Sequence, residues 1–228
     1  MSIIQINNLT KVYNSVAIPV HALNGVDLEV EKGEFAAVVG PSGSGKTTLL
    51  NIIGGLDSSS SGNVIVDGIN LETLSSSGLI DFRLRNIGFV FQAYNLIPVM
   101  TAFENVEFIL QLQGASKHKR KERAEQLLSA VGLKDRMHNR PAKLSGGQQQ
   151  RVAVARALAS KPKFVLADEP TANLDSKSSE NLLDIMEQLN KEENITFVFS
   201  THDQRVVNKA RRVVTIEDGK VKSDENKS

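Results

Sequence analysis

A glycine-rich stretch behind an apolar run is the strongest chemical signal in the sequence. The apolar residues 35–39 precede it, and a second apolar segment follows at Leu49-Leu50. This arrangement matches the pattern G-x-x-x-x-G-K-[S/T] between a strand and a helix. Glycines let successive N–H groups turn toward one phosphate, and the helix that follows presents its positive end there. We therefore predict a nucleotide-phosphate site formed by Gly40, Pro41, Ser42, Gly43, Ser44, Gly45, Lys46, Thr47 and Thr48.

Two side chains of this loop and two acids farther along the chain predict how a nucleotide would be bound and hydrolysed. Lys46 would neutralise the β- and γ-phosphates, and the Thr47 hydroxyl would ligate Mg²⁺. The apolar run 164–167 is followed by Asp168 and Glu169, which point in opposite directions if the strand continues. Asp168 can then hold Mg²⁺ through its water shell, while Glu169 orients and deprotonates a water molecule. A kinase is the alternative, although phosphate transfer to a hydroxyl would not need the second acid.

Short β-rich runs separated by helical patterns must position these groups. Several of the runs are continuously apolar, as in central strands that are covered on both faces. Strands that alternate with helices predict an α/β fold with a mainly parallel sheet between helices. The predicted strands are Ile3–Leu9, Val26–Val30, Phe35–Val39, Asn63–Val66, Ile87–Phe91, Lys163–Ala167, Ile195–Ser200 and Arg212–Glu217.

The start and the middle of the chain depart from this alternation. Turn signals at 31–33 and 67–68 predict hairpins, so residues 1 to about 70 should also carry antiparallel strands. No strand pattern occurs between about 93 and 160, which predicts an inserted helical lobe. Capping boxes at 101–104 and 201–204 predict two helix starts, and the tail 223–228 is expected to fray.

A third motif, Leu144-Ser145-Gly146-Gly147-Gln148, decides the family resemblance. Ser145 and two glycines before an alanine-rich segment make a second anion-binding helix start. The order of the phosphate loop, this motif and the Asp-Glu pair resembles the ATP-binding cassette (ABC) ATPases over nearly the whole chain. Two phosphate-seeking loops with one binding lysine suggest that two chains complete each other's sites. The resemblance implies an ATP-dependent head-to-tail homodimer in which Ser145, Gly146, Gly147 and Gln148 of one chain reach the γ-phosphate held by the other.

The resemblance also implies roles for four further residues, with ATP and Mg²⁺ as cofactors. Gln92 takes the place of a glutamine that joins Mg²⁺ and senses a transmembrane partner, and His202 that of a histidine on the γ-phosphate and attacking water. Asp175 matches a loop that crosses the dimer interface. Tyr13 stands where an aromatic ring stacks on adenine, although a lone tyrosine after a strand also fits hairpin packing. The implied fold is a P-loop NTPase core with an antiparallel flank and a helical lobe. It would be one domain, 1–228, with its core at about 1–92 and 161–228 and its lobe at about 93–160.

Variable segments are similar to the lipoprotein-release and macrolide-export branch of bacterial ABC proteins. They lie at 54–57, 85–92, 95–98, 101–106 and 166–171, with a further fragment at 14–20. This resemblance implies an integral membrane permease with a large extracytoplasmic domain, a periplasmic or extracellular adaptor, and lipoprotein, peptide or drug as cargo. The alternatives are a soluble ABC regulator of DNA repair or translation, and a nucleotide-regulated binding module without turnover. Regulators of that kind usually carry long coiled coils or two cassettes, and the 228 residues hold neither. The presence of Glu169 and His202 argues against a binding module without turnover.

Composition limits the other partners. The 228 residues hold 27 Lys+Arg against 26 Asp+Glu, a formal charge of +1, which argues against a dedicated nucleic-acid binder. Cysteine is absent, which excludes disulfides and thiol catalysis. No apolar run approaches the ~20 residues of a membrane-spanning helix. We expect a cytoplasmic protein that is peripheral on the inner face of the cell membrane through its permease.

Two surface segments each allow a purely structural interpretation and a functional one. Residues 92–100 are apolar and loop-like, which fits a groove wall for a permease helix or simple packing of the helical lobe. The basic run 117–123 fits the solvated face of a helix, with contact to membrane phosphates as the sharper alternative.

Overall fold

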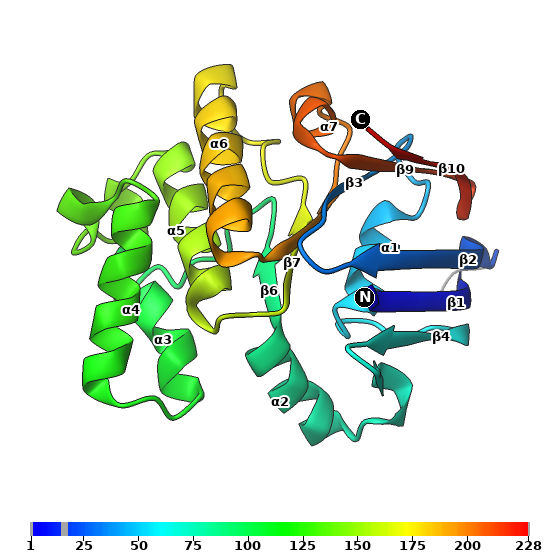
Figure 1. The fold of residues 1–228 in the computed structure, drawn as a ribbon, viewed down its shortest axis with the longest axis horizontal. Coiled ribbons are helices and arrows are strands. Elements are labelled where there is room, and N and C mark those ends of the chain that lie inside the picture. Colours follow the sequence, from blue (N-terminus) through cyan, green and yellow to red (C-terminus); the bar gives the residue numbers. More distant parts are fainter. Residues whose placement is uncertain (1, 15–17, 228) are drawn as a thin grey trace.

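The computed structural model describes residues 2–14 and 18–227, which form a mainly parallel sheet, an antiparallel sheet and a set of helices (Figure 1). In these residues the larger sheet has six strands in the order β10-β9-β3-β8-β7-β6. Only β10 runs antiparallel to its neighbour in it. Its strands are β3 (Phe35–Val39), β6 (Ile87–Val90), β7 (Phe164–Asp168), β8 (Thr196–Ser200), β9 (Arg212–Glu217) and β10 (Lys220–Asn226).

The smaller sheet confirms the antiparallel flank that the sequence predicts. Its order within the described residues is β2-β1-β4-β5, with β1 (Ser2–Tyr13), β2 (Val20–Glu31), β4 (Ser61–Val66) and β5 (Ile69–Asn70). The turn at 67–68 joins β4 to β5 as a hairpin. The hairpin predicted at 31–33 is wrong, because β2 and β3 belong to different sheets and do not pair. The predicted fraying is also wrong for residues 223–226, since β10 pairs with β9 as far as Asn226. The last residue of the predicted tail, 228, lies outside the described residues.

Helices cover both faces of the larger sheet. They are α1 (Lys46–Ile53), α2 (Ser76–Asn86), α3 (Ala102–Leu112), α4 (Lys117–Ala130), α5 (Gly146–Ala159), α6 (Ser176–Glu193) and α7 (Gln204–Lys209), with 3₁₀ turns at Leu71–Thr73, Lys134–Arg136 and Pro141–Lys143. Val165 and Phe199 face a core shared with α3 to α7, whereas Leu166 and Val198 face one shared with α1, α2 and the smaller sheet. This alternation explains why the central strands are apolar throughout.

One of the two predicted capping boxes is confirmed and the other is wrong. Thr101 caps α3 in a reciprocal capping box with Glu104, as predicted. The predicted box at Thr201 is wrong, because α7 begins later and Asp203 is its cap. Thr201 is instead buried, and its hydroxyl accepts a hydrogen bond from the Asp203 N–H at 2.9 Å.

The segment between β6 and β7 contains α3, α4 and α5, and its described residues form no strand. Figure 1 shows these helices grouped at the far end of the molecule from the smaller sheet. Buried Asn105 orders the loop before α3: its Oδ1 accepts from Ile97 N at 2.8 Å, and its Nδ2 donates to Thr101 O at 2.9 Å. In α4, Arg120 and Arg123 of the basic run pair with Glu107 and Glu193, so those two cations are directed inward.

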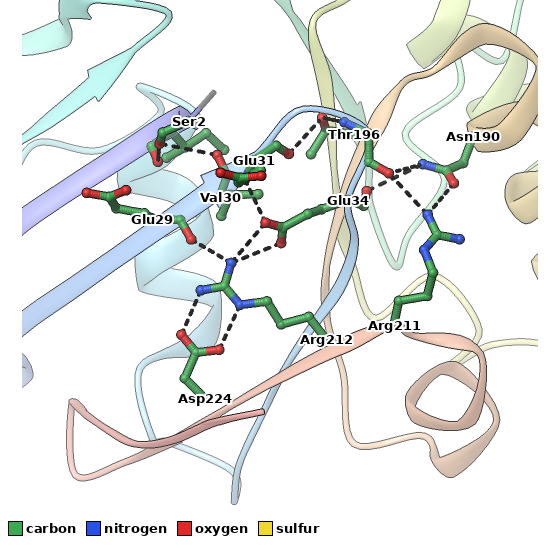
Figure 2. A network of polar contacts seen from close by, with 12 residues as sticks. Ser2, Glu29, Val30, Glu31, Glu34, Asn190, Thr196, Arg211, Arg212 and Asp224 are labelled. Carbon is green, nitrogen blue, oxygen red and sulfur yellow. Dashed lines mark hydrogen bonds and ion pairs between the residues drawn. The ribbon is translucent and has the colours of Figure 1, made fainter. Parts of the chain in front are cut away.

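Arg212 joins both sheets and the C-terminal strand (Figure 2). Its guanidinium donates to Asp224 at 2.7 and 2.6 Å, to Glu34 at 3.0 Å, and to the Glu29 carbonyl oxygen at 2.7 Å. The hydrogen bond to Asp224, with the charge of Glu34, raises the pKa of Arg212 although burial opposes this. Arg212 is the first residue of β9, so this network lies where the parallel strands begin, opposite the edge that carries the predicted site.

None of the helices among the described residues combines the length and the apolar character required to cross a bilayer.

Candidate active site

The predicted phosphate loop opens into a cavity of about 790 Å³. The cavity lies where β3, β6, β7 and β8 end, since the residues just beyond these strands line it. The structure brings together most of the predicted site there: Tyr13, Gly40, Pro41, Ser42, Gly43, Ser44, Gly45, Lys46, Thr47, Thr48, Gln92, Glu169 and His202. The carboxyl edge of a parallel sheet is the usual position of ligand sites in α/β folds.

The loop backbone has a shape that side chains would block. Gly40 has φ +151° and Gly45 has φ +104°, and a Cβ at either position would overlap a carbonyl oxygen, that of Ile216 or of Ala22. Lys46 is buried, and its Nζ donates to the carbonyl oxygens of Gly40 and Pro41, each at 2.9 Å. The loop therefore curls around its own lysine, as a phosphate cradle requires.

Thr47 and Asp168 lie together, although they are 121 positions apart in the sequence. The Thr47 hydroxyl donates to the two carboxylate oxygens of Asp168 at 3.0 and 3.2 Å. Hydroxyl and carboxylate oxygens suit Mg²⁺, which keeps several waters and takes the rest of its ligands from few protein groups and phosphates. Gln92 lines the same cavity, and its amide oxygen is a further candidate ligand. These residues fit a magnesium ion bound together with a nucleotide.

Glu169 is directed to different partners from those of Asp168. Its Oε1 lies 2.7 Å from His202 Nδ1, and its Oε2 accepts from Thr201 Oγ1 at 3.4 Å. The backbone of Glu169 is left-handed, with φ +46°, and its N–H donates to Ser200 O at 2.8 Å. Such a conformation is uncommon for a residue other than glycine and turns the chain sharply at the end of β7. The Glu169 carboxylate and the exposed His202 ring therefore form a dyad at the cavity wall.

The second anion-binding motif lies elsewhere on the chain. Ser145 caps α5: Gln148 N donates to Ser145 Oγ at 3.3 Å, and Ser145 N donates to Gln148 Oε1 at 2.9 Å. A Cβ on Gly146 would lie 2.8 Å from Tyr94 Oη, and one on Gly147 would lie 3.1 Å from Ser178. Close packing against neighbouring loops therefore accounts for both glycines. In the described part of the chain, none of residues 145–148 lines the cavity that Lys46 lines.

Asp175 is likewise outside that cavity and has a structural partner. It caps α6, where its carboxylate accepts from Ser178 N at 2.9 Å and from Ser178 Oγ at 2.6 Å. These hydrogen bonds lower the pKa of Asp175. The cap leaves the exposed carboxylate on the same surface as Ser145, because Gly147 and Ser178 are neighbours.

Gln150 connects the site segments in a way that the sequence analysis did not assign. This fully buried side chain of α5 donates from Nε2 to Pro170 O at 2.8 Å and to Phe91 O at 3.3 Å. It thereby ties the helix behind Ser145 to the residues next to Glu169 and Gln92. A polar residue in an otherwise apolar helix stripe was the available signal, but its partners are carbonyl groups far away in sequence.

Asp203 links the loops that follow β7 and β8. Thr171 Oγ1 donates to Asp203 Oδ2 at 2.6 Å, and Arg205 donates to the same carboxylate at 2.8 Å. Burial raises the pKa of Asp203, but the hydrogen bonds from Arg205 and Thr171 outweigh it and lower the pKa to about 2. The carboxylate next to His202 therefore stays ionised and holds the His202 segment against the segment after Glu169.

Comparison with known proteins decides the family. The family model described as ABC transporter matches residues 23–172, which include the phosphate loop, residues 144–148 and the Asp-Glu pair. The chain belongs to the ABC transporter family. It is an ATPase of that family: it binds ATP and hydrolyses it.

Three relatives show how far this ABC similarity extends. An uncharacterized ABC transporter ATP-binding protein of Thermotoga maritima is 46% identical over 99% of this chain and 96% of its own length. The macrolide export ATP-binding/permease protein MacB of Mannheimia succiniciproducens is 44% identical; the match covers 100% of this chain but 35% of MacB. A solved structure of an ATP-binding cassette, a dimer in a post-hydrolysis state bound to ADP and Pi, superposes with a TM-score of 0.90 at 44% identity and covers 98% of each chain. The fold of this chain is thus that of an ABC cassette.

Proposed function

We propose that two copies of this chain close around ATP and thereby drive a separate membrane permease. One observation carries the proposal: the phosphate loop and Ser145 lie on the same chain, yet Ser145 does not line the cavity of that loop among the described residues. Both features bind anions at the start of a helix. A second copy, turned head to tail, would bring its Ser145 and Asp175 to the cavity of the first. The solved cassette that is similar to this chain is itself described as a dimer.

Within such a closed site, the predicted site residues divide the work of binding and hydrolysis. The loop amides and Lys46 hold the β- and γ-phosphates, and Mg²⁺, bound by Thr47, Asp168 and Gln92, would neutralise charge on those phosphates. Glu169 accepts a proton from water as the water oxygen bonds to the γ-phosphorus, and the bond from that phosphorus to the ADP oxygen breaks. His202 holds Glu169 through the 2.7 Å contact and reaches the γ-phosphate and the water. Tyr13 stacks on adenine.

Dependence on protein concentration tests the shared site. If Ser145 must come from another chain, the ATPase rate per chain should rise with protein concentration and level off once dimers predominate. The measurement is phosphate release over a hundredfold range of chain concentration at saturating Mg-ATP. A constant rate per chain, in samples that light scattering shows to be monomeric, would contradict the proposal.

The permease would dock in an apolar groove beside residues 92–100. This cavity of about 450 Å³ is lined by side chains that include Ile80, Phe89, Ile97 and Phe108. Its wall reaches the site, because Arg156 donates to the carbonyl oxygens of Tyr94 (2.8 Å) and Asn95, while the Asn173 amide donates to Gln92 O at 2.9 Å. The permease part of the MacB relative supports a permease partner. The loop 92–100 would then serve both lobe packing and docking, with residues 93–160 as the helical lobe of one domain.

The branch predicts the rest of the assembly. A permease with a large extracytoplasmic domain, an adaptor beyond the membrane and a lipoprotein, peptide or drug cargo would place the chain at the inner face of the cell membrane. The branch fragment at 14–20 falls partly on residues 15–17, outside the described residues. A soluble regulator of DNA repair or translation remains the contrasting function, and no membrane protein should then accompany the chain.

The absence of cysteine from the sequence makes a clean crosslinking test possible. Ile80 lines the groove and is 58% exposed, whereas Ile69, on β5 outside the groove, is 41% exposed. We expect Ile80→Cys, but not Ile69→Cys, to crosslink in native membranes to an integral membrane protein encoded beside this chain. Equal crosslinking from both positions, or none from Ile80 in a complex that copurifies with the permease, would contradict this docking site.

A further inference from the structure

Lys11 contacts the ring of Tyr13, and Asp57 contacts its hydroxyl. Tyr13 Oη donates to Asp57 Oδ2 at 2.7 Å, and Lys11 Nζ donates to Asp57 Oδ1 at 2.7 Å. The same ammonium lies over the Tyr13 ring, 4.7 Å from its centroid, in cation–π geometry. The three groups thus form a closed triangle in which each contacts the other two. The described residues that line the cavity include Tyr13 but neither Lys11 nor Asp57.

The triangle is fastened to the helix that begins in the phosphate loop. Asp57 N donates to Asn51 O at 3.3 Å, so Asp57 lies just beyond α1, a helix of eight residues that starts at Lys46. Ser58 N donates to Asp57 Oδ1 at 2.8 Å, and Lys11 Nζ donates to Ser58 O at 2.6 Å. The distance between the phosphate loop and the Tyr13 ring is therefore set by α1 and this turn.

Both hydrogen-bonded groups have the protonation state that this geometry requires at neutral pH. Burial raises the pKa of the Asp57 carboxyl, but the hydrogen bonds from Lys11 and Tyr13 outweigh it and hold that pKa below its usual range. Burial, together with the hydrogen bond to Asp57, raises the pKa of Tyr13, so its hydroxyl keeps the proton that it donates. The tyrosine is therefore held at two points, by the hydrogen bond that its hydroxyl donates and by the ammonium over its ring.

We propose that Lys11 and Asp57 are positioning residues for the nucleotide base, which hold Tyr13 so that the ring face opposite Lys11 stacks on the base. The inference rests on the proposed stacking role of Tyr13. Lys11 occupies one face of the ring, and Tyr13 lines the cavity whereas Lys11 does not, so the other face is the one left for a base. Ordering the ring before binding removes the entropy that a free tyrosine would lose on stacking. The pair should therefore affect ligands that carry a base and leave base-free polyphosphates unaffected.

The test compares Mg-ADP with Mg-tripolyphosphate, which carries no base. Asp57→Asn replaces one of the two acceptor oxygens, which now serve Lys11, Tyr13 and Ser58, by an NH₂ donor and removes the negative charge. The hold on Tyr13 and Lys11 should therefore weaken. We expect the Kd of Mg-ADP to rise about three- to tenfold, which is part of the binding free energy of one base–aromatic stack. The Kd of Mg-tripolyphosphate should not change. The matched control is Asp67→Asn, because Asp67 also pairs with a lysine and is 30% exposed, against 29% for Asp57. It should leave both constants unchanged.

A double variant separates positioning from general stabilisation. Since Asp57 acts through the ring, Asp57→Asn added to Tyr13→Ala should weaken Mg-ADP no further than Tyr13→Ala alone. If Asp57→Asn does not fold, Tyr13→Phe, which keeps the ring but loses the bond to Asp57, should shift Mg-ADP in the same direction. An equal loss for both ligands, an additive double variant, or no shift beyond that of Asp67→Asn would overturn the inference. A wild-type chain that binds neither ligand would instead overturn the proposed phosphate site.

Discussion

Replacing Glu169 by glutamine separates proton transfer from nucleotide binding. The amide has the size of the carboxylate, and its oxygen can still accept from His202 Nδ1, which lies 2.7 Å from Oε1. The change therefore keeps the dyad but removes the proton acceptor. Loss of a general base costs roughly 10² or more in rate, and 10² corresponds to about 2.7 kcal/mol in the activation barrier. Mg-ATP should still bind, because Lys46, Thr47 and Asp168 are untouched.

The same variant should also shift the oligomeric state. Removing a negative charge from beside the γ-phosphates relieves repulsion in the closed dimer. Size-exclusion chromatography with light scattering should show Glu169→Gln as a monomer with ADP and a dimer with ATP. Asp168→Asn serves as the contrast. It should weaken Mg-ATP binding, because Asp168 and its hydrogen-bond partner Thr47 are predicted ligands of Mg²⁺. Turnover of Glu169→Gln near the wild-type rate, or a monomer at saturating ATP, would refute this account of Glu169.

Three further changes test separate parts of the site. Lys46→Ala removes the only cation of the loop, so calorimetry should show a tenfold or greater loss in Mg-ATP affinity, about 1.4 kcal/mol; unchanged affinity would exclude the phosphate-loop role. Asp203 has its pKa lowered from 3.8 to about 2, so Asp203→Asn should lose about 2 kcal/mol of unfolding free energy at pH 7. That difference should shrink as pH falls from about 4 to about 2, and a difference independent of pH in acid denaturation would contradict it. Gln150→Met should lower kcat severalfold without changing Mg-ATP affinity. Gln149→Met should change neither kcat nor that affinity, because within the described residues the Gln149 side chain donates to Leu144 O alone.

Local sequence patterns predicted the central strands well. Phe35–Val39 and Arg212–Glu217 have the predicted limits, because burial on one or both faces selects apolar and β-branched residues. β10 was missed because it is a polar edge strand, whose place depends on pairing with β9 and on the Arg212–Asp224 ion pair. Which sheet a strand joins is a long-range property, and so the turn at 31–33 could be mistaken for a hairpin.

In the candidate site, too, local motifs could be predicted and long-range contacts could not. Its motifs could be found because a phosphate cradle needs glycines, a lysine and a hydroxyl within a few consecutive residues. Contacts across the chain could not be found: His202 reaches Glu169 over 33 positions, and Tyr13 reaches Asp57 over 44. The cap at Asp203 was missed for a related reason. The Thr201 hydroxyl, which fits a capping box by spacing, is engaged by the Asp203 N–H and by Glu169.

Mixing two inactive variants tests most directly whether the site is shared between chains. Lys46→Ala retains a working Ser145, and Ser145→Arg retains a working phosphate loop. In a heterodimer, one site has both defects and the other has neither. With random pairing of equal amounts, about a quarter of all sites are intact, so ATPase activity should return to roughly that fraction of wild type if intact sites turn over independently. Each variant alone should stay inactive. No recovery on mixing, in samples where crosslinking shows that heterodimers form, would contradict a site built from two chains.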